Sequence, residues 1–293
     1  MTYWDYPYSY CLIKILDQCL RPKNLAIAIK ILYTPFNFME NDLQNHSWIL
    51  TQDGSWTLFS ERFQEACHST AGALAETHLH YIQGCRIEEK TDLSILEVGF
   101  GLGVGFLATY DKLHGQKKKW TFLSLEIDHD LLEWFRLKNL SHDFLSRLHW
   151  KKEGDLTYLE AQDEFITLTI LAGDARRSLP LFAETFCIKW NAIYQDAFSP
   201  KKNPTLWTKE WFELLKRFST LDVTLSTYSA SSSIRKGLHE TGWILSKGER
   251  FGLKRTSTRA GLQGETDPEI LLHLQRSPAL ALTDDNIKDI LHN

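Results

Sequence analysis

The sequence lacks any apolar run long enough to cross a bilayer. The longest early run, Leu25–Tyr33, is interrupted by Lys30, whereas a membrane-spanning helix needs about 20 apolar residues. The start of the chain also lacks the basic opening and small-residue cleavage site of a secretory signal. These absences argue against a membrane-spanning or secreted protein and predict a cytoplasmic one.

Cysteine is scarce, and no C-x-x-C pair occurs. The chain has five cysteines, which are Cys11, Cys19, Cys67, Cys85 and Cys187. This scatter suggests neither a zinc site nor a disulfide framework, and it fits a reducing cytoplasm. His78 and His80 point apart if their segment is helical, so we interpret them and His68 as ordinary histidines. We therefore expect no metal site.

The net charge of −4 does not indicate a nucleic-acid-binding protein, but the charge is unevenly distributed. Residues 200–261 hold 12 Lys and Arg against 5 Asp and Glu, a local excess of +7 that leaves −11 for the remainder. Such a segment can supply phosphate contacts. The alternative is a set of solvated helix faces.

The first chemical motif joins the end of an apolar strand pattern at residues 93–98 to the start of an apolar helix pattern at 104–113. It reads Glu97-Val-Gly99-Phe100-Gly101-Leu-Gly103-Val-Gly105. Glycines allow a sharp turn and let a ligand approach the backbone. The N–H groups that open the following helix then face the ligand.

The glycine spacing distinguishes two classes of ligand. Dinucleotide sites use Gly-x-Gly-x-x-Gly, with the pyrophosphate at the helix N-terminus, and Glu97 would repel a pyrophosphate. A carboxylate suits a cation, such as the ammonium of S-adenosylmethionine. The E-x-G-x-G-x-G order resembles the first motif of class I methyltransferases. The alternative is a glycine-rich strand–helix turn of some other α/β protein.

Strand and helix patterns alternate along the middle of the chain. Strands are predicted at 93–98, 120–126, 165–174, 190–196 and 221–228, and a closing hairpin at 243–247 and 253–259. A hairpin at Asp53-Gly54 and a helix over 65–82 precede them. The pattern predicts an α/β, Rossmann-like class I methyltransferase fold, with a seven-stranded, mostly parallel sheet that includes an antiparallel hairpin strand.

Four predicted strands end in an acid, and ligands of open α/β sheets lie outside those ends. Under the methyltransferase interpretation, Glu97 binds or orients the ammonium, directly or through water. Glu126 accepts the ribose hydroxyls, and Asp174 binds the adenine amino group. Asp196 borders the cofactor where methyl transfer would occur. A single acid at a strand end is commonly a helix cap or a surface charge, whereas four in order favour a shared ligand.

A second distinctive stretch, residues 196–207, follows the fourth strand. It reads Asp196-Ala-Phe198-Ser-Pro-Lys201-Lys202-Asn203-Pro-Thr-Leu-Trp207. Its prolines and asparagine predict a rigid loop over the reaction centre, with the next helix starting near residue 205. The two lysines are then available to phosphate. Phe198 and Trp207 either stack on a base and wall the pocket, or are core aromatics.

This loop resembles that of a known family, the methyltransferase half of MnmC and its stand-alone, MnmD-like homologues. The family's D-x-F-x-P-x-K-N-P-x-x-W loop matches Asp196 to Trp207, and its E-x-G-F-G-x-G turn matches Glu97 to Gly103. Further matches at 53–76 and 229–255 extend the resemblance over about residues 50–261. It implies S-adenosyl-L-methionine as cofactor and 5-aminomethyl-uridine, with or without 2-thiolation, at the tRNA wobble position as substrate.

The implied reaction is direct displacement at the sulfonium methyl by the primary amine. Asp196 is the candidate to accept the proton of the amine; the alternative is that it only positions the cofactor. Asn203 belongs to the substrate loop. The candidates for phosphates of the anticodon stem-loop are Lys201, Lys202, Arg235, Lys254 and Arg255.

The predicted organisation has four parts: a poorly defined extension or lid at 1–38, a hairpin and helix at 39–92, the methyltransferase domain at 93–261, and a tail at 262–293. MnmC continues into a flavin-dependent oxidase, and we expect this chain to lack that step and to need no flavin. Gly105 departs from the family, which often has Asn there. Two alternatives stay open: a methyltransferase of another RNA or of a small-molecule amine, and a non-catalytic S-adenosylmethionine-binding module.

Overall fold

The computed structural model describes residues 43, 46–251 and 256–288 of the 293-residue chain. The predicted extension at 1–38, Lys254 and Arg255 lie outside these residues. Within the described ranges, no helix is both long and apolar enough to cross a membrane. In the same ranges, no three His, Cys, Asp or Glu side chains are grouped so as to hold a metal ion.

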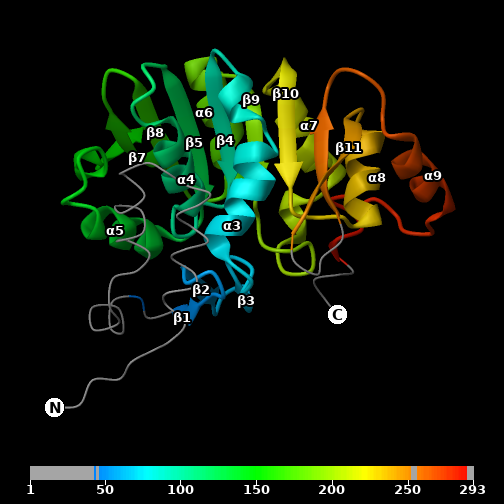
Figure 1. Ribbon diagram of the computed structural model, residues 1–293, viewed down its shortest axis with the longest axis horizontal. Helices are drawn as coiled ribbons and strands as arrows, with labels where there is room; N and C mark the ends of the chain where they lie inside the picture. The colour runs from blue at the N-terminus through cyan, green and yellow to red at the C-terminus, as the bar shows by residue number, and fades with distance from the viewer. Residues whose placement is uncertain (1–42, 44–45, 252–255, 289–293) are drawn as a thin grey trace, which may run out of the picture.

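A nine-stranded sheet runs through the centre of the described chain, in the order β11-β12-β10-β9-β4-β5-β8-β7-β6 (Figure 1). Its five central strands are parallel: β10 (Ser219–Thr227), β9 (Trp190–Gln195), β4 (Leu93–Val98), β5 (Trp120–Glu126) and β8 (Ile166–Ala172). Antiparallel strands extend both edges: β12 (Thr256–Gly261) with β11 (Ile244–Arg250), and β7 (Leu156–Gln162) with β6 (His149–Glu153). The carboxyl ends of the parallel strands therefore meet at one edge.

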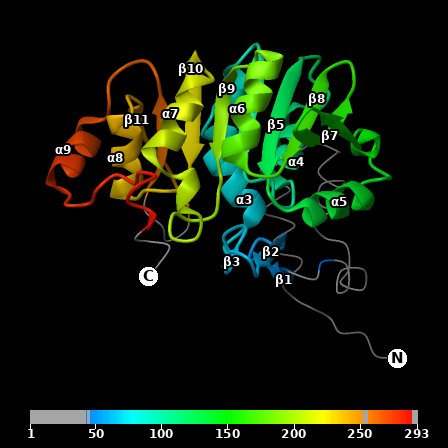
Figure 2. The same ribbon diagram turned by 180° about the vertical axis from the view of Figure 1, so that it is seen from behind.

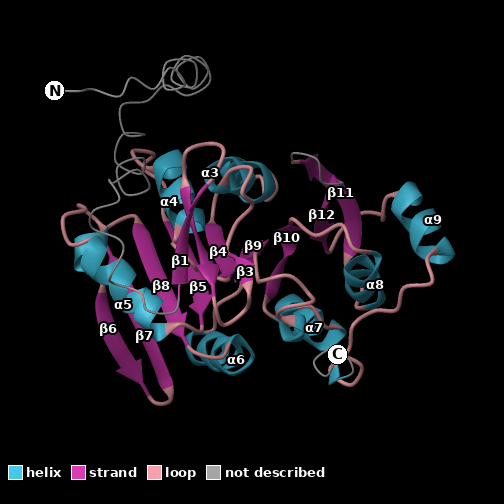
Figure 3. Ribbon diagram, turned by 90° about the horizontal axis from the view of Figure 1, so that it is seen from below, coloured by secondary structure: helices cyan, strands magenta, loops and turns pink. Residues whose placement is uncertain are grey.

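Helices cover both faces of the sheet (Figures 2 and 3). One face carries α3 (Ala73–Thr77), the π-helical segment η2 (His78–Gln83), α4 (Val104–Leu113) and α5 (His129–Lys138). The other carries α6 (Ala175–Phe186), α7 (Lys209–Arg217) and α8 (Ser232–Glu240), with α9 (Pro268–Arg276) beside α8. Short 3₁₀ turns lie at η3 (Ile87–Glu89), η4 (Leu145–Arg147) and η5 (Pro204–Leu206).

Each face of the sheet has its own hydrophobic core because alternate side chains of a strand point to opposite faces. In β4, Ile95 belongs to the core under α4 and α5, whereas Leu96 and Val98 belong to the core under α6, α7 and α8. All three side chains are fully buried. Burial on both faces explains why this strand reads as an almost continuous apolar run.

A small antiparallel sheet lies below the carboxyl edge of the large one (Figure 1). It consists of β1 (His46–Leu50), β2 (Trp56–Ser60) and β3 (Glu65–Ala66). The predicted turn at Asp53-Gly54 joins β1 to β2, with Gly54 at a φ of 81°. The Asp53 carboxylate accepts the N–H groups of Ser55 and Ala75, which ties this turn to α3.

The predicted fold class is confirmed, and all seven expected strands are present. The sequence interpretation missed the β6–β7 hairpin, because β6 is polar and mostly exposed and so shows no apolar alternation. The helix predicted over 65–82 was wrong at its start. Glu65 and Ala66 pair with β2, and Gly72, at a φ of 146°, precedes a helix that begins at Ala73.

The described part of the tail, 262–288, packs back on the methyltransferase fold. Asp267 caps α9 by accepting the N–H groups of Glu269 and Ile270. Beyond α9, the carboxylate of Asp284 accepts two hydrogen bonds from the Arg176 guanidinium at the start of α6, at 2.5 and 2.6 Å. The tail is thereby tied to a helix that begins beside the predicted cofactor site.

We expect Gly103→Ala to destabilise the fold strongly. Gly103 precedes α4 at a φ of 72°, and an added Cβ would lie 2.7 and 2.8 Å from the buried rings of Phe135 and Phe100. Left-handed strain and overpacking together cost about 2–4 kcal/mol of unfolding free energy, measured by urea denaturation. The matched control is Gly115→Ala, which has a φ of 81° and no neighbour within 4 Å. An equal loss in the two variants would exclude the ring contact as the cause.

Candidate active site

A cavity of about 250 Å³ lies between the carboxyl edge of the parallel strands and the small sheet. Its walls come from the ends of β4, β5, β8 and β9, from the loop after β9, and from residues 46–68. Of the residues predicted from sequence, eight line it: Gly99, Phe100, Gly101, Glu126, Asp174, Asp196, Phe198 and Asn203. Three of the four predicted acids therefore share one cavity.

Glu126 is fixed by backbone groups at the end of β5. Its Oε1 accepts the N–H groups of Ile127 and Asp128 at 2.8 and 2.9 Å, and its Oε2 accepts the N–H of Gly101 at 3.0 Å. Burial raises the pKa of Glu126, although the three donors favour its carboxylate. The side chain thus joins the glycine turn to the second strand and presents an acceptor at the cavity wall.

Glu97, which was predicted to bind or orient the ammonium directly or through water, does not line the cavity. It is buried under the first turn of α4, where it accepts the Ser124 hydroxyl at 2.6 Å. A Cβ at Gly105 would lie 1.8 Å from its Oε1, so Gly105 leaves the space that Glu97 fills. Burial raises the pKa of Glu97 well above its usual range. Gly103 lies behind the turn as well, against Phe100 and Phe135.

Asp174 lines the cavity at the start of α6. Its Oδ1 accepts the N–H of Arg176 at 2.9 Å and so caps the helix. The sequence interpretation named a ligand role and a capping role as alternatives for such an acid. The two roles are compatible here because one carboxylate oxygen makes the cap while the residue borders the cavity.

Asp196 follows β9 and is held on two sides. Its N–H donates to the Val98 carbonyl at 3.1 Å, and its Oδ1 accepts the Tyr81 hydroxyl at 2.6 Å. Gly99 permits this approach, since a Cβ there would lie 2.9 Å from the Asp196 carbonyl oxygen. Asp196 therefore lies directly against the glycine turn, in the wall of the cavity.

The loop after β9 is locked by its own contacts and by the small sheet. Trp207 is fully buried and donates its indole N–H to the Phe198 carbonyl at 2.7 Å. The predicted stacking of Trp207 on a base does not fit this position, and the core alternative does. Phe198 stacks on Phe63 with ring centroids 4.5 Å apart. The Ser199 N–H donates to the Glu65 carboxylate of β3.

The predicted basic contacts divide into two groups. Lys201 and Lys202 are exposed beside the cavity-lining Asn203, where they remain available to a large ligand. Arg235 is buried and donates to the Thr258 hydroxyl and to the Ser257 carbonyl, which fits a structural role rather than a phosphate contact.

Other cations of the basic segment are paired within the fold. Lys209 pairs with Glu240, Arg217 with Glu184, and Lys247 with Glu269. These pairs support the solvated-face interpretation for most of residues 200–261.

Sequence reasoning assigned no individual role to four residues that shape the site: His46, Phe63, Tyr81 and Tyr228. Phe63 lay in a segment that matched the family, which was the available signal. Tyr81 contacts Asp196 from 115 residues away, a separation that no local motif reveals. Tyr228 donates its hydroxyl to the Ala197 carbonyl at 2.9 Å and so holds the residue after Asp196.

We expect a pH-dependent contribution to stability from His46, whose Nε2 lies 2.9 Å from the Asp128 carboxylate. Their hydrogen bond raises the pKa of His46 above 6.5 and lowers that of Asp128 below 3.8. The His46 contribution is fully present below pH 6.5 and is lost as pH rises through its folded-state pKa. The Asp128 contribution is present above pH 3.8 and is lost as pH falls through the folded-state pKa of Asp128. Between pH 4 and 6.5, the free energy of unfolding measured by urea denaturation should be about 1 kcal/mol lower for His46→Gln than for wild type. A constant difference up to pH 9 would contradict this.

Comparisons with known proteins identify the family to which the chain belongs. A family model described as S-adenosyl-L-methionine-dependent methyltransferase matches residues 136–263. The tRNA 5-methylaminomethyl-2-thiouridine biosynthesis bifunctional protein MnmC of Ralstonia nicotianae is 33% identical over 240 residues, covering 72% of this chain and 33% of that protein. The MnmC of Cupriavidus metallidurans is 31% identical, with the same two coverages. The chain thus spans about a third of the length of these relatives.

A solved structure agrees with the sequence comparisons. The crystal structure of MNMC2 from Aquifex aeolicus is 25% identical, with a TM-score of 0.64, and the match covers 95% of this chain and 92% of that one. The similarity therefore extends over nearly the whole length of both chains. The described chain carries an MnmC-like methyltransferase domain that uses S-adenosyl-L-methionine.

Proposed function

We propose that this protein N-methylates the aminomethyl group of 5-aminomethyl-uridine, with or without 2-thiolation, at the wobble position of tRNA in the cytoplasm. The observation that carries the proposal is the position of Asp196. It lies in the cavity wall between the glycine turn and a locked loop that carries two exposed lysines. A cofactor on one side and a nucleoside on the other would meet there.

The cavity suits S-adenosyl-L-methionine, which supplies an electrophilic methyl group on a sulfonium sulfur. The donor and acceptor set fits: Glu126 offers a carboxylate for ribose hydroxyls, Asp174 one for an amino group, and Gly99 and Gly101 leave the backbone open. The adenosine part would lie between the ends of β5 and β8. Glu97, buried beneath α4, supports the turn from below instead of contacting the ligand.

On the acceptor side, the protonated amine must lose its extra proton before its nitrogen can attack the methyl carbon. Asp196 is the group placed to accept that proton or to orient the neutral amine, because it borders the cavity where the two substrates would meet. The nitrogen–carbon bond forms as the carbon–sulfur bond breaks, and the electron pair of that bond leaves with sulfur. Holding the amine, the methyl carbon and the sulfur in line supplies much of the rate.

Features at the rim support a nucleic-acid acceptor. Phe63 and Phe198 form a stacked pair, and the Arg62 guanidinium lies 5.4 Å from the centre of the Phe63 ring. Unpaired anticodon bases are typically recognised on aromatic and guanidinium planes. Arg62, Lys201 and Lys202 are exposed around this pair and can contact the neighbouring phosphates.

The proposal is tested with purified full-length protein and tRNA that carries unmethylated 5-aminomethyl-uridine. We expect transfer of a labelled methyl group to that nucleoside, identified by mass spectrometry after digestion, and none to the same tRNA transcribed without modification. Methylation of unmodified tRNA, or of free amines alone, would assign the enzyme to the alternative substrate classes. The visible absorbance of the same preparation tests the expectation that no flavin accompanies the methyl transfer.

A further inference from the structure

The structure assigns Tyr81 as a positioning residue that holds the Asp196 carboxylate toward the reacting amine; this assignment rests on the proposed function. Tyr81 comes from η2, on the face of the sheet that α4 covers, and reaches Asp196 across 115 residues of sequence. The proposed function by itself gives no task to η2.

The contact is short and directional. The Tyr81 hydroxyl donates to Oδ1 of Asp196 at 2.6 Å, the distance of a hydrogen bond between a hydroxyl and a carboxylate. Burial, together with the nearby charge of Asp196, raises the pKa of Tyr81 well above its usual value. The hydroxyl therefore keeps its proton at neutral pH and acts as a donor. Such a bond fixes one carboxylate oxygen and so sets the direction of the other.

The ring of Tyr81 is held as firmly as its hydroxyl. It is 2% exposed and stacks on Tyr194 of β9, with ring centroids 5.2 Å apart. π-Helical turns are often found at functional sites. Here the π-helical turn places the Tyr81 side chain under the end of β9, directly before Asp196.

The segment that carries Tyr81 is anchored to β9 and β10. The Ser226 hydroxyl donates to the His80 carbonyl, and the Cys85 thiol lies within hydrogen-bonding distance of the Ile193 and Thr224 carbonyls. Gly84 permits this packing, since an added Cβ would lie 2.4 Å from the Ser226 hydroxyl.

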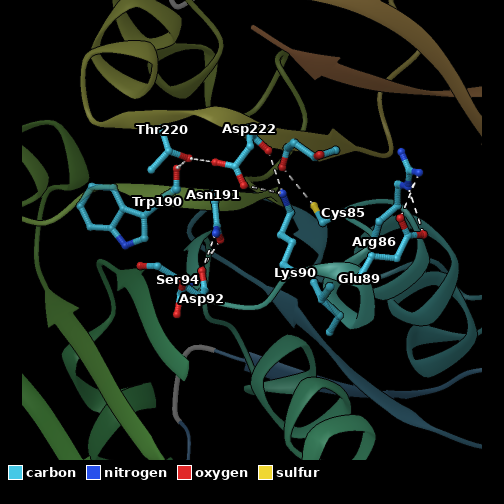
Figure 4. A network of polar contacts seen from close by, with 12 residues as sticks. Cys85, Arg86, Glu89, Lys90, Asp92, Ser94, Trp190, Asn191, Thr220 and Asp222 are labelled. Atoms are coloured by element: carbon cyan, nitrogen blue, oxygen red, sulfur yellow. Dashed lines mark hydrogen bonds and ion pairs between the residues drawn. The ribbon is translucent and has the colours of Figure 1, made fainter. Parts of the chain in front are cut away.

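Figure 4 shows how the anchoring continues beyond Cys85, where Lys90 donates to the Asp222 carbonyl and Asn191 bonds to both Asp92 and Ser94. Together with the contacts of His80 and Cys85, these bonds fix the segment between η2 and β4 relative to β9 and β10, and β9 ends directly before Asp196. Tyr81 is therefore a rigid support for that carboxylate.

The first test compares two tyrosines with different neighbours. Tyr81→Phe keeps the ring and removes the hydroxyl, and we expect kcat to fall about 10- to 100-fold with KM for both substrates within about twofold. The matched control is Tyr194→Phe, which removes a buried hydroxyl bonded to Thr109 and should keep kcat within about twofold. An equal fall in both variants, or a loss confined to KM for the cofactor, would overturn the assignment.

A second readout does not depend on activity. The Tyr81 hydroxyl proton should give a downfield NMR resonance that is absent from both Tyr81→Phe and Asp196→Ala. Replacing Tyr81 by 3-fluorotyrosine keeps the fold and should shift that resonance. If the wild-type protein transfers no methyl group to tRNA, the proposed function is wrong. The resonance would still report the hydrogen bond between Tyr81 and Asp196. Its absence from wild type, or its persistence in Asp196→Ala, would overturn the inference.

Discussion

Replacing Asp196 by alanine is expected to lower kcat for methyl transfer by about 10²–10⁴-fold while leaving the affinity for S-adenosyl-L-methionine measurable. Steady-state transfer to modified tRNA gives the first quantity, and calorimetry gives the second. The informative result is a large fall in kcat without a matching fall in cofactor affinity. It distinguishes a group that acts on the amine from one that only holds the cofactor.

The expected separation follows from the way the cavity is built. The cofactor side is formed by the glycine turn, Glu126 and Asp174, none of which depends on the Asp196 side chain for its own hydrogen bonds. Asp196 is held instead by Tyr81 and by the backbone of β4. Losing its carboxylate therefore removes the acceptor for the proton of the amine without dismantling the cofactor wall.

A matched variant, Asp196→Asn, sharpens the test. It keeps the side-chain volume and an oxygen that can accept from Tyr81, but it cannot take a proton at neutral pH. We expect it to be as inactive as Asp196→Ala. Near-normal turnover in either variant would remove Asp196 from proton transfer. A large loss of cofactor affinity in both would support the alternative in which Asp196 only positions the cofactor.

The strands and the residues at their carboxyl ends were predictable because both follow from local pattern. A parallel strand buried on both faces reads as an apolar run, and an acid at its end marks the ligand edge. Glu126, Asp174 and Asp196 were located in this way, and all three line the cavity. The closing hairpin of β11 and β12 was predicted differently, from the glycine-bounded turn between its strands.

The direction in which a side chain points could not be read from the sequence. Glu97 belongs to the same series of acids, yet it lies inside β4, one residue before the end of the strand, and it is buried under α4 because Gly105 leaves space there. Trp207 and Arg235 looked like substrate contacts by residue type, but their partners are the Phe198 carbonyl and β12. The contacts of Arg235 and the bond from Tyr81 to Asp196 join segments that are distant in sequence. The positions of Glu97 and Trp207 depend instead on how a turn and a loop fold back on themselves.

Glu126→Gln is expected to weaken the binding of S-adenosyl-L-methionine about 10- to 100-fold. The wild-type carboxylate accepts three backbone N–H groups, with Gly101 on one oxygen and Ile127 and Asp128 on the other. A glutamine amide has only one oxygen, so its NH₂ group must face one of these donors. Either the glycine turn or the end of β5 then loses its acceptor, and the carboxylate offered to the ribose loses its charge.

The matched control is Glu97→Gln, which makes the same chemical change one strand away. Glu97 lies outside the cavity wall, and its raised pKa favours the neutral acid, which an amide resembles in shape and charge. Calorimetry should therefore give Glu97→Gln a cofactor affinity within about threefold of wild type. If Glu97→Gln loses as much affinity as Glu126→Gln, the ammonium contact predicted from the sequence is correct, and Glu97 must turn toward the cavity when the cofactor binds. If only Glu126→Gln loses affinity, the cofactor is recognised by the end of β5, with Glu97 supporting the turn from below.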